Sequence, residues 1–122
     1  MFLQLAHTKL NVYQISEELV IESYKITRLF PQEERFALVQ QIRRAATSVR
    51  LNLAEGCSRK SKAERKRFFE ISRGSVIEID SAIGIAFKLS YVSEKQLASL
   101  GSLIVNTFKL LSGMIAKEEA LN

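Results

Sequence analysis

Apolar residues recur every three or four positions along most of the chain, a spacing that predicts amphipathic helices. No segment alternates between apolar and polar residues as a half-buried β-strand does. Turn and capping signals between the apolar runs divide the chain into four helices, at about residues 10–28, 32–55, 62–91 and 94–117. Because the connections are short, successive helices should lie antiparallel. We therefore expect an all-α protein in which residues 1–122 form a single antiparallel up-down-up-down four-helix bundle.

The ends of the predicted helices carry recognisable signals. Pro31 suits the first turn of the second helix, where a missing backbone N–H is tolerated. Gly56 is expected to end the same helix as a C′ residue in the left-handed conformation. Residues 61–64 (SKAE) and 93–96 (SEKQ) match the capping-box pattern, so they should open the third and fourth helices.

The predicted fourth helix has apolar residues on more than one face. Its main stripe centres on Leu97, Ile104, Phe108 and Ile115. A second stripe, about 90 to 120° from that centre, is formed by Leu103, Leu110 and Met114. A peripheral bundle helix normally buries one face, so we expect the second stripe to contact another copy of the chain in a homo-oligomer. The alternative is a wide core within one chain.

A polar stripe follows one flank of the predicted second helix. Its members recur at steps of three or four residues and are Gln41, Arg44, Ser48, Asn52 and Glu55. The predicted third helix has a similar stripe, made of Glu70, Gly74, Glu78 and Ser81. Two interpretations remain open: these residues form a hydrogen-bonded network at a helix or subunit interface, or they are a solvated polar flank.

The distribution of charge favours an anionic partner. The net charge is +5, but residues 42–73 contain ten Lys and Arg against three acids, so this window carries +7 and the rest of the chain is slightly acidic. Basic residues of the window fall on helix stripes away from the expected core or in the turn. Those predicted to bind DNA or RNA are Arg43, Arg50, Arg59, Lys60, Lys62, Lys66 and Arg73. The alternative is a solvated charged face.

The residue inventory argues against catalysis. His7 is the only histidine, so a His-based triad and a His-rich metal site are excluded. Cys57, beside Arg59 and Lys60, should have a favoured thiolate, but it lacks a general base. No Gly-rich phosphate-binding motif occurs. We expect no enzymatic activity, no cofactor, no metal and no small-molecule substrate.

No feature of the sequence predicts export or membrane insertion. The single cysteine cannot form an internal disulfide, and the N-terminal segment lacks the long apolar region of a secretory signal. The most apolar window, residues 102–116, is shorter than the roughly 20 residues of a membrane span and includes Asn106 and Lys109. We expect a cytoplasmic protein without a membrane partner.

Several patterns in the sequence resemble a known family. They are KLNVYQIS at residues 9–16, the FP..E turn at 30–34, Q.RRAA.S...N.AEG at 41–56 and F..I..GS..E at 68–78. Together they cover most of the chain and resemble the 23S rRNA intervening-sequence protein family of bacterial four-helix bundle proteins. That family includes the accessory variability determinant of diversity-generating retroelements.

The resemblance implies an up-down four-helix bundle whose retroelement members assemble as basic, barrel-like pentamers that bind nucleic acid and a reverse transcriptase. The residues that match signature positions, interpreted as structural or interface residues, are Arg44, Ser48, Asn52, Glu55, Ser75 and Glu78. The predicted function is therefore that of a non-catalytic, ring-like homo-oligomer, with a pentamer as the expected ring, that binds nucleic acid through a basic surface and serves a partner such as a reverse transcriptase. The rival is a protein-protein interaction scaffold that binds no nucleic acid.

Overall fold

The structure, a computed structural model, describes residues 1–120 and is all-α, as the sequence predicts. Its helices are α1 (Asn11–Thr27), α2 (Leu38–Ser58), α3 (Lys62–Lys88) and α4 (Glu94–Ala120). Two short 3-10 helices, η1 (Ala6–Lys9) and η2 (Gln32–Glu34), precede α1 and α2. The described residues contain no β-strand.

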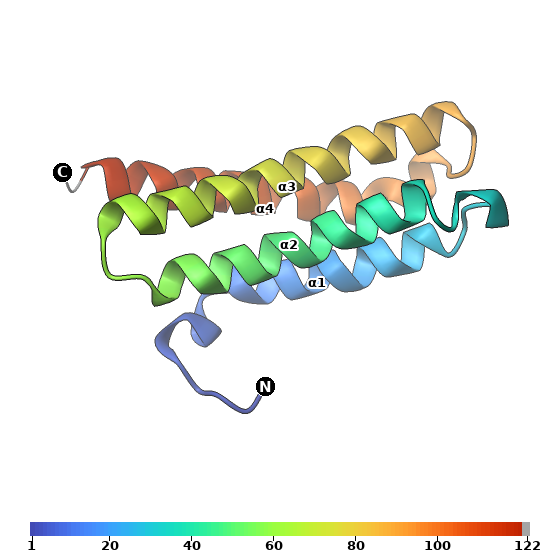
Figure 1. Cartoon of the computed structure of the whole chain (residues 1–122). Coiled ribbons are helices and arrows are strands. Elements are labelled where there is room, and N and C mark those ends of the chain that lie inside the picture. The colour runs from blue at the N-terminus through green and yellow to red at the C-terminus, as the bar shows by residue number, and fades with distance from the viewer. Residues whose placement is uncertain (121–122) are drawn as a thin grey trace.

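The four helices lie side by side, and the chain reverses direction at each of the three connections between them (Figure 1). Packing contacts join α1 to α2, α2 to α3, α3 to α4 and α4 back to α1, so the helices enclose one core. In Figure 1, α1 and α2 form the lower layer, and α3 and α4 form the upper one. The residues that precede α1 extend away from the bundle below the lower layer.

Each helix contributes fully buried side chains to the core, among them Leu19, Ile42, Phe69 and Leu100. Burial of one such side chain stabilises the fold by about 1.5–3 kcal/mol. Small residues let α2 and α3 approach closely, since the buried Ser72 hydroxyl donates a hydrogen bond to the carbonyl oxygen of Val49 across the contact (2.6 Å). The hairpin of α2 and α3 is therefore the most tightly joined part of the bundle.

Gly56 does not end α2, so the prediction of a left-handed C′ residue is wrong. The helix continues through Gly56 to Ser58, and no glycine among residues 1–120 has a positive φ. A Cβ at position 56 would lie 2.7 Å from Cε1 of Phe69 and 3.1 Å from Cβ of Phe68. Glycine is required here because α3 passes too close for a side chain.

The start of α2 also differs from the prediction. Residues 32–34 form η2, and α2 begins at Leu38, after the irregular backbone of Ala37 (φ −122°, ψ −104°). A tertiary contact holds this turn, because the Glu34 carboxylate accepts hydrogen bonds from the Tyr91 hydroxyl (2.6 Å) and, more weakly, from the Leu38 N–H (3.4 Å). The connection between α1 and α2 is thus tied to the connection between α3 and α4.

The remaining helix ends follow the predicted signals with small shifts. Ser61 caps α3 by accepting a hydrogen bond from the Glu64 N–H (3.0 Å). Ser93 and Gln96 cap α4 reciprocally, with distances of 3.1 and 2.9 Å. α3 ends at Lys88, three residues early, because Ser90 adopts a left-handed conformation (φ 64°). α4 extends to Ala120, beyond the predicted end.

By length and composition, α4 is long and apolar enough to cross a membrane, which corrects the expectation drawn from its apolar window alone. In the structure it packs between α1 and α3 and buries residues that include Leu100, Leu111 and Glu118. The carboxylate of Glu118 pairs with Arg65 of α3 (2.9 Å). These contacts are those of a bundle helix, and the absence of a membrane partner stays a prediction.

The hydrogen bond between Tyr91 and Glu34 predicts a titration near the alkaline limit. Hydrogen bonding to the Glu34 carboxylate raises the pKa of Tyr91 to about 12 from its ordinary value of 10.0. Because the folded-state pKa is the higher one, the stabilisation is complete below about pH 10 and is lost as the pH rises through 12.

We expect the phenolate absorbance of the wild type, minus that of Tyr91→Phe, to rise with a midpoint near pH 12. In Glu34→Gln the midpoint should move back toward 10 because the carboxylate is gone. A wild-type midpoint at the ordinary value would show that this hydrogen bond does not form in solution.

Candidate nucleic-acid interface

The basic residues predicted on α2 lie against α1. Arg43 donates from Nε to the Thr27 hydroxyl (2.9 Å), and its guanidinium carbon lies 4.5 Å from the ring centre of Tyr24. Arg50 donates to the carbonyl oxygen of Tyr13 (2.6 Å) and forms an ion pair with Glu17 (3.2 Å). Both arginines therefore help to hold α2 on α1.

Two of the basic residues predicted on α3, Lys66 and Arg73, lie on the other side of the hairpin, toward α4. Lys66 pairs with Glu119 (3.4 Å), and Arg73 donates to the Ser112 hydroxyl (3.2 Å). The seam between α1 and α2 and the seam between α3 and α4 occupy opposite edges of the bundle. The structure consequently separates the two predicted stripes instead of joining them into one surface.

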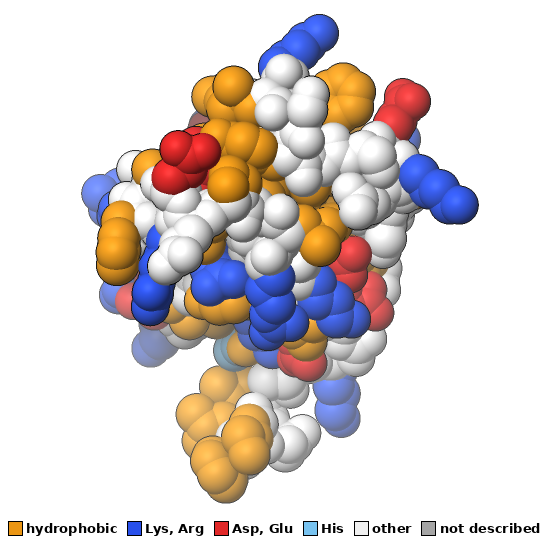
Figure 2. Space-filling model, turned by 90° about the vertical axis from the view of Figure 1, so that its right-hand side faces the viewer, with side chains coloured by type: hydrophobic (Ala, Val, Ile, Leu, Met, Phe, Trp, Pro, Cys, Tyr) orange, Lys and Arg blue, Asp and Glu red, His pale blue; other side chains and the backbone are white. Residues whose placement is uncertain are grey.

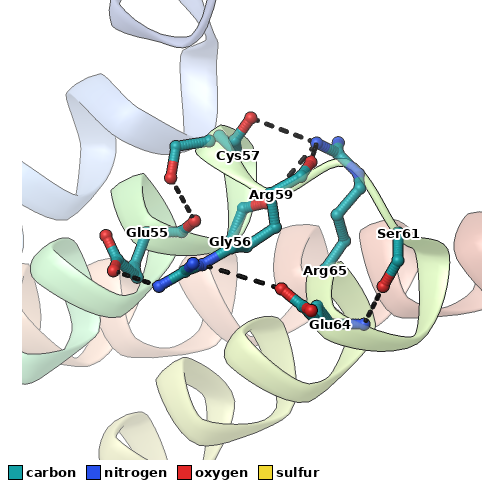
Figure 3. Close-up of polar contacts among 8 residues, drawn as sticks. Glu55, Gly56, Cys57, Arg59, Ser61, Glu64 and Arg65 are labelled. Carbon is teal, nitrogen blue, oxygen red and sulfur yellow. Dashed lines mark hydrogen bonds and ion pairs between the residues drawn. The ribbon is translucent and has the colours of Figure 1, made fainter.

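The connection between α2 and α3 has its own arrangement of charges (Figure 3). Arg59 pairs with Glu55 (2.7 Å) and lies 3.9 Å from a carboxylate oxygen of Glu64, so acids surround its charge. Arg65 donates to the carbonyl oxygens of Cys57 (3.1 Å) and Arg59 (3.3 Å). Two exposed lysines, Lys60 and Lys62, flank Ser61 at the start of α3. Most predicted phosphate-binding arginines are thus already engaged within the chain.

Cys57 is not the activated thiol that its basic neighbours suggested. Burial raises the pKa of its thiol above the ordinary value of 9.0, and the nearby charge of Arg65 offsets this only in part. The prediction of a favoured thiolate is therefore wrong. Within residues 1–120, no group of three or more His, Cys, Asp or Glu side chains is placed to hold a metal ion.

A groove of about 700 Å³ runs along the outer face of α2. Its basic residues are Arg35, Arg43 and Arg44, and its aromatic residues are Tyr24 of α1 and Phe36. The other lining residues are Val39, Gln40, Thr47, Ser48, Leu51 and Asn52. Among the described residues no Asp or Glu lines this groove, so its positive charge is not neutralised locally.

Two of the groove arginines are free to bind an anion. Within residues 1–120, neither Arg35 nor Arg44 forms an ion pair. The guanidinium of Arg35 lies over the ring of Phe36, 5.3 Å from its centre, and Arg44 is exposed. Figure 2, which looks onto one end of the bundle, shows Lys and Arg side chains gathered over the layer of α1 and α2. This groove is the strongest candidate for contact with phosphate.

Residues on the predicted polar flank meet this groove. The Asn52 amide donates to the Ser48 hydroxyl (2.9 Å), and the Ser75 hydroxyl of α3 donates to the same oxygen (2.9 Å). A small network therefore exists between α2 and α3, as one of the two interpretations expected. Glu78 lies outside it, because it is exposed and forms no ion pair within residues 1–120. Glu55 pairs with Arg59 instead.

The second apolar stripe of α4 is partly used within the chain. Leu103, Leu110 and Met114 are half-buried and pack against the core, which supports the wide-core alternative for these residues; their role as a subunit interface stays a prediction. Phe108, which the helical wheel placed in the core, is 39% exposed. It lines a groove of about 290 Å³ between α3 and α4 with the exposed residues Ile77 and Val105.

The sequence did not identify Arg35, Phe36 or Tyr24 as site residues. Extending the predicted second helix back to residue 32 placed Arg35 and Phe36 on a regular helix, whereas the break at Ala37 turns them into the groove. Arg44 was assigned only a structural role, although its place on the polar flank beside Ser48 could have identified it as a residue of the groove.

The fold and the groove define a small all-α protein of four helices with an arginine-lined surface. The chain belongs to the 23S rRNA-intervening sequence protein family, which matches residues 8–113 and confirms the resemblance found in the sequence. No match was found among curated proteins.

A crystal structure with the same fold is that of a protein with unknown function from the S23 ribosomal protein family of Bacteroides thetaiotaomicron VPI-5482. The two chains are 22% identical, with a TM-score of 0.76 over 85% of this chain and 97% of the other. Neither comparison names an enzymatic activity.

Proposed function

We propose that this protein is a non-catalytic, cytoplasmic homo-oligomer that binds nucleic acid through the α2 groove. The observation that carries the proposal is that three arginines line one groove among whose described lining residues there is no acid. Guanidinium groups bind phosphate oxygens through paired N–H donors and stay charged at any physiological pH. A protein that reads phosphates in this way binds with little sequence preference.

Assembly would multiply these contacts. In the proposed ring of antiparallel up-down-up-down bundles, with a pentamer as the expected number, each copy presents the same groove to one nucleic acid. Linked sites bind far more tightly than one site alone, because the second contact is intramolecular. Such a ring suits an accessory protein that holds nucleic acid for an enzyme such as a reverse transcriptase.

A second candidate function is that of a protein-protein interaction scaffold. The apolar groove between α3 and α4, with Ile77, Val105 and Phe108 exposed, favours it. In that function the arginines of the α2 groove would pair with acidic residues of a neighbouring subunit or partner.

The test compares two double variants that each remove two positive charges, one pair from the α2 groove and the other from the start of α3. We expect Arg35→Gln with Arg44→Gln to weaken binding of a generic duplex and of a single strand. For duplex DNA, the slope of the logarithm of the affinity against the logarithm of the salt concentration should become shallower by about 0.9 per lost phosphate contact. Lys62→Gln with Lys66→Gln should bind as wild type does. Affinity is measured from about 50 to 200 mM salt, on protein freed of nucleic acid.

Light scattering after gel filtration gives the mass of each variant. A wild type that binds neither probe at low salt would rule out nucleic-acid binding and favour the scaffold. Loss of binding only in the Lys62 and Lys66 variant would move the site to α3, where the sequence first placed part of it. A monomer mass at micromolar concentration would contradict the ring.

A further inference from the structure

Phe36 is exposed beyond what the fold requires. Its side chain is 81% exposed, at the point where the chain passes from η2 into α2. Arg35 lies over one face of the ring, and the high exposure leaves the other face open to solvent. Since burial of an aromatic ring normally stabilises a protein, a ring held in water beside arginines points to a ligand.

Tyr24 places a second ring in the same groove. It comes from α1, and Arg43 lies over its ring as Arg35 does over Phe36. The groove therefore presents two pairs, each made of a guanidinium and an aromatic ring. Proteins that bind single-stranded nucleic acid combine these two groups, because phosphates contact the cations and unpaired bases stack on the rings.

We infer that the α2 groove binds single-stranded nucleic acid in preference to duplex, with one base stacked on Phe36 and neighbouring phosphates on Arg35 and Arg44. The inference rests on the proposed function and names its substrate class. Duplex DNA presents the same phosphates, but its bases are already stacked on one another and cannot reach the ring without unpairing. A protein partner is less well matched, because an apolar side chain on Phe36 would leave the adjacent guanidiniums unpaired.

The dimensions of the groove suit a short strand. From Val39 to Asn52 the groove follows α2 for about 20 Å, at 1.5 Å per residue, which spans roughly six nucleotides at the 3.4 Å spacing of a helically stacked strand. Few groups along it remain to read bases, since the Asn52 amide already donates to Ser48. The Thr47 hydroxyl likewise donates to the backbone of Arg43. We therefore expect stacking without base selectivity.

The experiment separates stacking from charge. The probes are a fluorescent oligothymidylate of about eight nucleotides, a strand of the same length with abasic sites, and a duplex with the same number of phosphates. Phe36→Leu should weaken binding of the oligothymidylate about tenfold and leave the other two probes unchanged. Phe36→Tyr should retain binding, because it keeps the ring. Ile85→Ala, which removes an exposed apolar side chain of α3 outside the groove, is the matched control and should have no effect.

Each alternative result has a definite meaning. Equal binding of the oligothymidylate and the abasic strand by wild type would overturn the inference, and so would an unchanged affinity in Phe36→Leu. The proposed function would survive both if Arg35→Gln with Arg44→Gln still weakens binding. A changed oligomer mass in Phe36→Leu would place the ring at a subunit contact and also overturn the inference. Failure of wild type to bind any probe would refute the proposed function as well.

Discussion

Replacement of Arg65 by methionine should lower the free energy of unfolding by about 3 kcal/mol at neutral pH. The reason is that Arg65 joins three segments. Its Nε donates to the carboxylate of the buried Glu118 (2.9 Å), and its Nη1 donates to carbonyl oxygens at the end of α2, including that of Cys57 (3.1 Å). Methionine retains most of the apolar stem but leaves the Glu118 charge and these carbonyl groups without their donor.

A double-mutant cycle tests this explanation. We expect Arg65→Met with Glu118→Leu to recover a large part of the loss, because the buried carboxylate is then removed together with its partner. The adjacent pair of Lys66 and Glu119, on the same two helices, is the control. Both of its side chains are at least 36% exposed, so Lys66→Met should change stability by less than about 1 kcal/mol. Urea denaturation of the wild type, Arg65→Met, Glu118→Leu and the double variant gives the coupling energy.

Equal losses in Arg65→Met and Lys66→Met would contradict a special role for the buried pair. A double variant no more stable than Arg65→Met would assign the loss to the unpaired carbonyl groups at the end of α2 instead. Either outcome would still leave the helix assignments intact, because neither Arg65 nor Lys66 is part of the buried core.

The four helices could be predicted because their cause is local. Apolar spacing and the caps at Ser61 and Ser93 act within a few residues, and the structure follows them closely. The start of α2 could not be predicted, because residues 32–37 contain good helix formers. There the tertiary hydrogen bond between Tyr91 and Glu34 joins residues far apart in the sequence.

The charge excess of residues 42–73 predicted only part of the candidate site, because Arg43 and Arg44 lie inside this window and Arg35 lies outside it. A helical wheel shows that Arg43 and Arg50 are off the core, but not that Thr27 and Tyr13 of α1 accept their hydrogen bonds. Those partners lie 16 and 37 residues away in the sequence. The free arginines, Arg35 and Arg44, could be recognised only after the paired ones had been identified in three dimensions.

Gly56 does not end α2 as predicted, and the structure instead requires glycine there because α3 passes close to it. We expect Gly56→Ala to lower the free energy of unfolding by up to about 2 kcal/mol. Alanine gains about 1 kcal/mol of helix propensity, but a Cβ 2.7 Å from the fully buried ring of Phe69 costs about 1–3 kcal/mol or more in overpacking. Gly74→Ala is the matched control on α3. Nothing lies within 4 Å of its Cβ, so it should stabilise the protein by up to about 1 kcal/mol.

A third variant separates the close approach seen in the structure from the C′ role predicted by the sequence. Asparagine adopts the left-handed conformation readily, so at a C′ position Gly56→Asn would be tolerated better than Gly56→Ala. In a helix packed against Phe69, the larger side chain must be worse than alanine. Thermal unfolding of the three variants decides between them. If Gly56→Ala stabilised the protein as Gly74→Ala should, α2 could move away from Phe69 at little cost, and the tight hairpin would not depend on glycine.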